Sequence, residues 1–307
     1  AYDASAHTGA NLTGAANTDV VQASAGVATF AGLRLEGVAA SAYVLNFATQ
    51  NTTGYNGLTT TQNIALTAGT ETHLRVVTQP ANIVAGVTFS SAVKAEILDD
   101  WNNSVLDVSN TVTIKPTLVA DALATSVVDS TKAAVANAAG LVTFTGLTFT
   151  KAGTQFVQFT ADNLTAVTSD AFVITNAAAH HLTWITTPVG AKNDYAIKGA
   201  AGADPELEVR DQFQNPVLVG ATTSVSVAEQ TSTADVLAIS GASATSDAFA
   251  RVKFSNLVMR AKAGSYGLDF TAANGNLPIN GNVATASIAI TFGDPAALRL
   301  TRAAAGA

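Results

Sequence analysis

The sequence carries the same short blocks three times, at a period of about 110 residues. The clearest block reads GVATFAGLRL at 26–35, GLVTFTGLTF at 140–149 and ARVKFSNLVM at 250–259. Its central phenylalanines are 114 and 110 residues apart. A chain of 307 residues has room for two or three domains of ordinary size, and this period is close to one domain. The sequence therefore predicts a tandem array of similar domains.

A second block follows each copy of the first, at 43–47, 155–159 and 266–270. Its first, third and fifth residues are expected to point inward, as one face of a strand requires. An Ala-Gly pair precedes the last two copies, at 152–153 and 263–264. This pair is typical of a turn between two antiparallel strands, so each repeat is predicted to contain such a turn here.

Two further blocks complete the unit. An opening block lies at 74–80, at 182–188 and, in shorter form, at 298–301. The first two copies end in proline, which cannot donate to a strand ladder and therefore favours an edge strand. The fourth block, at 93–103 and 207–216, is a strand that runs into an Asp-x-aromatic-x-Asn turn. Asp and Asn close such turns through their own side chains.

Composition supports a chain made of strands. Valine and threonine are abundant, whereas the helix formers Leu, Glu, Lys and Arg are sparse, and charged residues make up only 12%. Short strands with turn signals every 8–12 residues, in units of this length, are typical of immunoglobulin-like sandwiches. The predicted fold class is all-β, with tandem immunoglobulin-like antiparallel β-sandwiches.

In this order, the four blocks resemble the tandem bacterial immunoglobulin-like (Big-type) repeats of surface-layer, adhesin and cell-wall proteins. The resemblance covers nearly the whole chain and implies a spacer or display module rather than a particular chemistry. The sequence departs from the family pattern at Gln155, where a tyrosine is expected. It also departs at Asn103 and Asn215, where a Gly-Asn pair is common.

The blocks predict four segments. These are a partial immunoglobulin-like domain at 1–73, two complete domains at 74–181 and 182–297, and the opening strand of a further repeat or a donor strand at 298–307. Two alternatives follow. The chain is a portion of a longer array, or its last strand completes the sandwich of a neighbouring copy by donor-strand addition.

The sequence contains no recognisable catalytic constellation, so we expect no enzyme. There is no cysteine, and the histidines are His7, His73, His180 and His181. No nucleophile elbow, phosphate-binding loop or dinucleotide fingerprint is present. His73 and His181 each precede an opening leucine, which places them at the predicted domain junctions.

The acidic turns are the best candidates for an ion site, and no other cofactor is expected. Calcium prefers six to eight oxygen ligands from carboxylates, amides and carbonyls. The alternative is that these side chains only close the turns. The candidate ligands are Asp99, Asp100, Asn102, Asp107, Asp211 and Asn215.

Aromatic residues could instead bind sugars. Trp101 and Phe213 occupy matching positions in the two turns, which favours packing plugs over ligand platforms. Trp184 lies in an opening strand and is expected in the core.

Charge limits the partners. The net charge of −7 and a pI near 4.9 disfavour nucleic acid and anionic membranes as ligands. No run of apolar residues reaches the length of a membrane span, so membrane insertion of this segment is not expected.

Together these features predict a structural, extracellular protein of the cell surface: a component of a surface layer, sheath or filament. Its expected partners are copies of itself and cell-wall or surface glycans. Two alternatives remain: the stalk of a large adhesin, and ancillary domains of a secreted polysaccharide-active enzyme.

Overall fold

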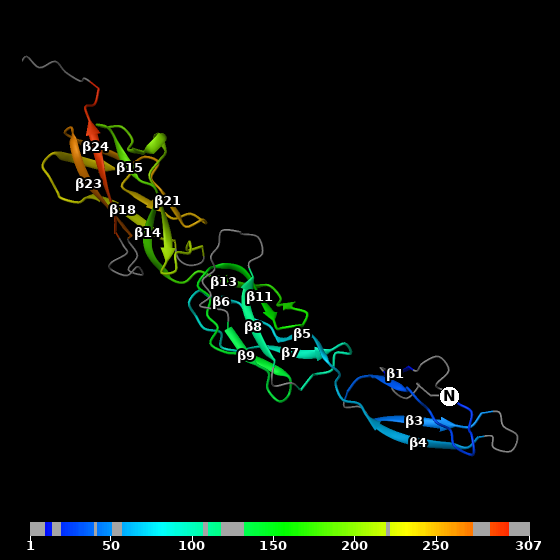
Figure 1. The fold of residues 1–307 in the computed structure, drawn as a ribbon. Coiled ribbons are helices and arrows are strands. Elements are labelled where there is room, and N and C mark those ends of the chain that lie inside the picture. Colours follow the sequence, from blue (N-terminus) through cyan, green and yellow to red (C-terminus); the bar gives the residue numbers. More distant parts are fainter. Residues whose placement is uncertain are drawn as a thin grey trace, which may run out of the picture. The chain divides into compact units, whose positions relative to one another are not determined.

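The computed structural model describes residues 10–13, 20–39, 42–50, 57–106, 110–117, 132–218, 222–272 and 283–294. This described part is made of β-strands with one 3₁₀ turn, Ala200–Gly202, and contains no α-helix (Figure 1). Accordingly, it contains no helix with the length and apolarity needed to cross a membrane. The chain divides into two compact units. Unit 1 comprises 1–81, 88–147 and 154–172, and unit 2 comprises 82–87, 148–153 and 173–307.

In the part of the first repeat that the structure describes, there are two small antiparallel sheets. One pairs β1 (Ala10–Thr13) with β2 (Arg34–Gly37), and the other pairs β3 (Ala42–Ala48) with β4 (Thr59–Ala65). Residues 28–33 form no strand, whereas residues 141–144 and 251–253, in the other two copies of the GVATF block, do. In the other repeats this block pairs with the strand that carries the acidic turn. Among the described residues, the first repeat has no copy of that strand.

The second repeat is built from two sheets that face each other. One has the strand order β10-β7-β5 and the other β6-β13-β11-β8-β9, with β12 pairing with β11. The strands are β5 (Glu71–Thr78), β6 (Ile83–Val84), β7 (Val93–Asp99), β8 (Thr111–Thr117), β9 (Lys132–Val135), β10 (Leu141–Phe144), β11 (Gly153–Thr160), β12 (Val167–Thr168) and β13 (Phe172–Thr175). The opening strand β5 lies at a sheet edge, as its proline predicts.

The third repeat has the same plan. Its sheets have the orders β14-β17-β21 and β16-β15-β24-β23-β18-β20, and β19 pairs with β22. The strands are β14 (Ala179–Thr186), β15 (Pro188–Lys192), β16 (Lys198–Gly199), β17 (Glu206–Asp211), β18 (Ser224–Glu229), β19 (Val236–Ser240), β20 (Ser243–Thr245), β21 (Arg251–Lys253), β22 (Val258–Ala261), β23 (Gly264–Ala272) and β24 (Val283–Thr291).

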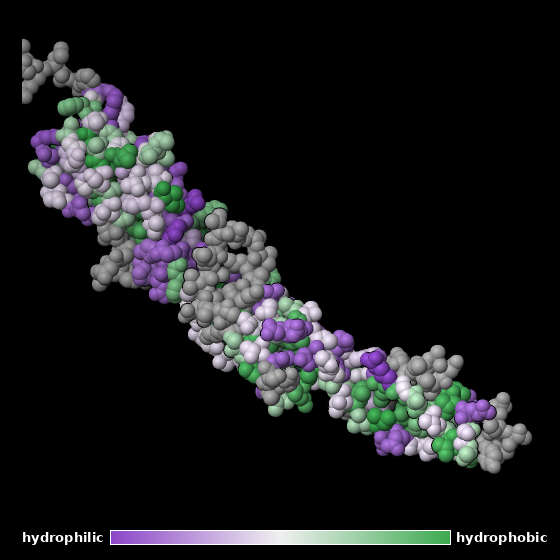
Figure 2. Space-filling view, in the orientation of Figure 1, coloured by the Kyte–Doolittle hydropathy of each residue, from purple (hydrophilic) through white to green (hydrophobic). Residues whose placement is uncertain are grey.

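The repeating blocks supply the cores. In β23, Tyr266, Leu268 and Phe270 are buried on one face, which confirms the predicted alternation. The ring of Phe270 contacts both Phe254, at 5.3 Å between centroids, and Trp184, at 4.8 Å. Trp184 therefore packs against the core, as expected. On the face shown in Figure 2, hydrophobic and hydrophilic residues are interspersed.

A tyrosine hydrogen bond recurs in the first and third repeats. The hydroxyl groups of Tyr43 and Tyr266 donate to the carbonyls of Val38 and Lys262, each at 2.8 Å. Such a tyrosine corner is a hallmark of immunoglobulin-like sandwiches. Gln155 takes the equivalent place in the second repeat and is buried. With the two-sheet repeats, these features confirm the predicted fold class. Two pairs, β6 with β13 and β15 with β24, are parallel.

Candidate functional site

The two Asp-x-aromatic-x-Asn turns, Asp99–Asn103 and Asp211–Asn215, have the same internal geometry. Oδ1 of Asp99 accepts from the N–H groups of Trp101 and Asn103, both at 2.9 Å. Oδ1 of Asp211 accepts from the equivalent groups two and four residues on, at 2.8 and 2.9 Å. Each aspartate is the last residue of a mostly buried strand, β7 or β17, so the turn is held at a fixed place. This is the turn-closing role that the sequence predicts.

The first turn also binds residues of the repeat before it, within unit 1. Nδ2 of Asn103 donates to the carbonyl of Gly37 at 3.0 Å, and its Oδ1 accepts from the N–H of Ala39 at 2.6 Å. Oδ2 of Asp99 accepts from the N–H of Gly69 at 2.8 Å and from Nδ2 of Asn103 at 2.9 Å. We call this set of contacts junction A.

The second turn makes the same contacts within unit 2. Nδ2 of Asn215 donates to the carbonyl of Thr150 at 2.7 Å, and its Oδ1 accepts from the N–H of Ala152 at 2.9 Å. Oδ2 of Asp211 accepts from the N–H of Ala177 at 2.9 Å and from Asn215 at 2.9 Å. We call this set junction B. In both junctions the asparagine amide pairs with two backbone groups that are two residues apart, as a neighbouring strand would.

The sequence spacing of the backbone partners is also conserved between the junctions. Gly69 lies five residues before the opening leucine Leu74, and Ala177 lies five residues before Leu182. The N–H group at this position therefore reaches the aspartate of the following turn in both cases. Because the recognised groups belong to the backbone, no side-chain motif marks them. The constant spacing is the signal that could have found them.

A histidine supports each turn. Nε2 of His73 lies 3.2 Å from Oδ1 of Asn102, and Nε2 of His181 lies 3.1 Å from Oε1 of Gln214. Asn102 and Gln214 are equivalent positions, and both have positive φ angles, 61° and 69°. The sequence placed these two histidines at the junctions, and both contact the acidic turns there.

The aromatic residues of the two turns behave differently. A Cβ atom added to Gly86 would lie 2.3 Å from Cζ of Phe213, so the ring sits directly on this glycine. Phe213 therefore acts as the predicted packing plug. Trp101 is 41% exposed, and for this residue the plug prediction is wrong. The hydrogen bonds, rather than the aromatic contact, are what the junctions share.

The carboxylates of both turns are saturated with donors. A carboxylate offers about four acceptor positions, and Asp99 and Asp211 each receive four N–H hydrogen bonds. Burial raises the pKa of Asp99, but hydrogen bonds from the Asn103 side chain and from backbone N–H groups of Gly69, Asn103 and Trp101 lower it more, so its pKa lies below the usual value.

Of the remaining ion candidates, Asn215 contacts the Asp211 carboxylate, but it does so as a donor through Nδ2. Asp100 and Asn102 are exposed, and Asp107 lies outside the described residues. In the part of the chain that the structure describes, no three His, Cys, Asp or Glu side chains form a group that could hold a metal. Calcium binding therefore stays a prediction, and the described residues offer no group of acidic side chains that supports it.

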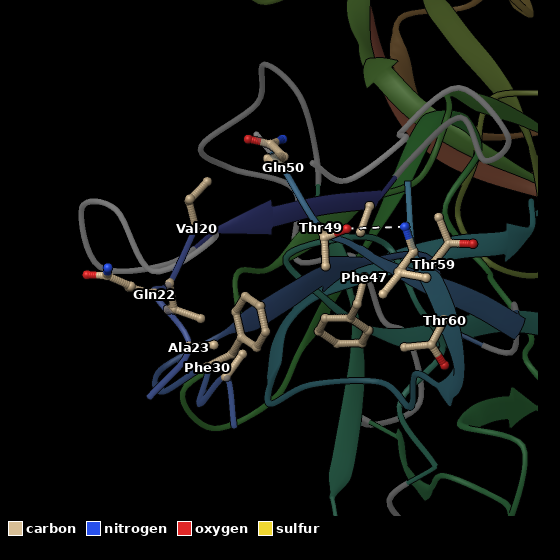
Figure 3. A pocket seen from close by; sticks show the side chains of 13 residues that line it. Val20, Gln22, Ala23, Phe30, Phe47, Thr49, Gln50, Thr59 and Thr60 are labelled. Carbon is tan, nitrogen blue, oxygen red and sulfur yellow. Dashed lines mark hydrogen bonds between the residues drawn. The ribbon is translucent and has the colours of Figure 1, made fainter. Parts of the chain in front are cut away.

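The first repeat has a groove of about 440 Å³ (Figure 3). The rings of Phe30 and Phe47 lie 5.1 Å apart along it, and Thr49, Thr59 and Gln50 supply polar groups. These phenylalanines belong to the blocks whose equivalents, Phe144 and Phe159, are buried in the second repeat. The groove is therefore an open part of the first repeat's core, and it bears no cluster of titratable side chains.

No protein-family model matches the sequence, and no curated protein matches it. Solved structures with similar strand arrangements include the adhesin InvE of Yersinia pseudotuberculosis, at 18% identity and TM-score 0.30, covering 71% of this chain and 59% of that one. They also include invasin, a bacterial integrin-binding protein, at 13% identity and TM-score 0.27, covering 73% and 40%. Domains 1–6 of the surface layer protein SbsC match at 12% identity and TM-score 0.28, covering 87% and 37%. The chain thus spans less than two thirds of each of these structures.

Proposed function

We propose that this chain is a structural, extracellular component of a cell surface, whose immunoglobulin-like repeats form a surface layer, sheath or filament. The observation that carries the proposal is the duplicated junction. Two successive acidic turns make the same three hydrogen bonds to the repeat before them. Because the same contact occurs at two places in one chain, we take it as a specific interface between neighbouring repeats.

The hydrogen bonds of the junctions are of a kind that can hold neighbouring repeats together. Each turn offers a carboxylate and an amide to backbone groups, and bonds to an ionised acceptor are about twice as strong as neutral ones. In arrays of repeats, stability is approximately the sum of the repeats and of the interfaces between neighbours.

The proposal includes no catalytic role. The polar side chains of the two acidic turns, Asp99, Asp211, Asn103 and Asn215, are buried and hydrogen-bonded to backbone groups. The proposed partners are copies of the same chain and the glycans of the wall or surface. The low content of charged residues, 12%, favours close lateral contact between copies.

Electron microscopy of the native material tests this proposal. We expect ordered sheets or filaments whose density repeats along the chain. Isolated flexible rods that carry a separate binding domain would contradict it and would instead support the adhesin-stalk alternative. A catalytic domain in the same native polypeptide would support the ancillary-domain alternative.

A further inference from the structure

The third repeat presents, at its end, the backbone groups that the junctions use. Gly293 lies five residues before Leu298, which begins the third copy of the opening block. Gly69 and Ala177 have the same spacing to their own opening leucines, and their N–H groups donate to the junction aspartates. Among the described residues, the N–H of Gly293 has no hydrogen-bond partner.

A second equivalent group lies in the loop before β23. Ala263 precedes Gly264 as Ala152 precedes Gly153, and the N–H of Ala152 donates to the asparagine of junction B. Within the described part of the chain, the N–H of Ala263 also has no hydrogen-bond partner. Two of the three backbone groups that bind an acidic turn are therefore present and available.

One groove brings the two groups together. Ala263 and Gly293 both line a groove of about 630 Å³, together with Asn193, Leu237 and Phe292. Phe292 is 85% exposed and Leu237 is 75% exposed, which is high for large apolar side chains. Asn176 holds the position of Phe292 in the second repeat. There it is buried and accepts from the N–H of Leu218, which follows the acidic turn.

We propose that this groove is the acceptor site for the Asp-x-aromatic-x-Asn turn of a further immunoglobulin-like repeat that opens at Leu298. This proposal rests on the proposed function, because it treats junctions A and B as built connections. The carboxylate of the incoming turn accepts from the N–H of Gly293, and its asparagine Oδ1 accepts from the N–H of Ala263. Paired backbone donors with an adjoining apolar surface fit a turn that carries two side-chain acceptors and an aromatic ring.

The aromatic contact differs from that of junction B. The residue equivalent to Gly86 is Asp194, which has a positive φ of 67° but also a side chain. An incoming ring cannot rest there as Phe213 rests on Gly86. The exposed side chains of Phe292 and Leu237 supply the apolar surface instead. Junction A, where Trp101 is 41% exposed, shows that the hydrogen bonds do not require a plug.

The test extends the chain by one repeat. Residues 1–297 are followed by a second copy of 182–297, so that the copied Leu182 takes the place of Leu298 and the five-residue spacing is kept. Amide hydrogen exchange is then measured by NMR at Gly293 and Ala263 in the original and the extended chain. We expect exchange at both amides to slow by roughly tenfold or more in the extended chain, because each gains a hydrogen bond.

Variants of the appended copy assign the contacts. Asp211→Ala in that copy should restore fast exchange at Gly293, and Asn215→Ala should restore it at Ala263. Asp247→Ala in the copy is the matched control, since the Asp247 carboxylate accepts its two backbone hydrogen bonds within its own turn, and the substitution should change neither amide. Protected core amides such as those of Val252 and Leu268 show that the copy is folded.

Two outcomes separate this inference from the proposed function. Fast exchange at Gly293 and Ala263 beside a folded copy overturns the inference. If the Ala152 and Ala177 amides are protected in the same sample, junction B still stands as an interface between repeats. If Ala152 and Ala177 also exchange as fast as unstructured amides, the junctions themselves fail, and with them the proposed function.

Discussion

Truncating one junction asparagine should destabilise the third repeat through its contact with the second. Asn215 is fully buried, and its amide makes three hydrogen bonds: to the carbonyl of Thr150, from the N–H of Ala152, and to the carboxylate of Asp211. Asn215→Ala removes all three and leaves a buried carboxylate with one donor fewer. The backbone groups of Thr150 and Ala152 lose their shared partner.

The magnitude follows from these bonds. A neutral hydrogen bond contributes roughly 1 kcal/mol net, and one to a charged group about 1.5–3 kcal/mol. Because the three bonds share one side chain, they do not add fully. We therefore expect Asn215→Ala to lower the free energy of unfolding of the third repeat by about 2–4 kcal/mol.

The assay uses the tryptophan of the third repeat as its probe. In a Trp101→Phe background, Trp184 is the only tryptophan, and it packs on Phe270 in the core. Urea unfolding followed by its fluorescence reports on this repeat alone, which avoids treating a multi-domain chain as one transition. Asp247→Ala is the matched control, because Asp247 closes an exposed turn by two local hydrogen bonds. It should cost about 1 kcal/mol or less.

Hydrogen exchange at the Ala152 amide distinguishes loss of the junction contact from loss of a turn-closing hydrogen bond. The N–H of Ala152 donates to Asn215 across the junction, so its exchange should accelerate in Asn215→Ala and not in Asp247→Ala. If Asn215→Ala costs no more stability than the control and leaves exchange at Ala152 unchanged, Asn215 does not stabilise the third repeat through this junction.

Three further predictions follow from the site. The folded pKa of Asp99 lies below its unfolded value of about 4, so the stability that this carboxylate contributes is present above that pH and is lost as the pH falls through the folded pKa. The difference in the free energy of unfolding in urea between wild type and Asp99→Asn should therefore shrink on acidification below about pH 4. A difference that stays constant with pH would contradict this. Because the acceptor positions of Asp99 and Asp211 are filled, thermal unfolding curves in chelator and in calcium should coincide, and a higher Tm in calcium would instead support the ion hypothesis. Gly86→Ala should destabilise the chain by about 1–3 kcal/mol, through its positive φ and the clash with Phe213. Adding Phe213→Ala should relieve only the clash. Strictly additive losses in the free energy of unfolding would show that the two residues do not touch.

Much of the fold could be predicted because the strands repeat. Alternation in 155–159 and 266–270 placed the inward residues correctly, and proline placed β5 at a sheet edge. Residues 28–33, in the first copy of the GVATF block, form no strand although the other two copies do, because a strand also needs a partner. Local sequence reports the tendency to form a strand, whereas pairing is a non-local property.

The site was predicted only in part. The two acidic turns and the two histidines were identified from their positions, and the turn-closing roles of Asp99 and Asp211 were foreseen. Their partners in the preceding repeat were not, since Ala39 and Ala152 contribute only backbone N–H groups. Trp101 and Phe213 look alike in sequence. They differ because Phe213 meets a glycine in the neighbouring loop, which lies far away in the chain.

Electron cryomicroscopy of the native assembly, with and without the junctions, would show whether the junctions order the array. A strain producing Asn103→Ala and Asn215→Ala together would be compared with one producing Asp247→Ala, after hydrogen exchange has shown that the repeats of both proteins are folded. If the junctions build the array, the control keeps a regular density along the chain and the junction variant loses it. Equal order in the two assemblies would contradict the account.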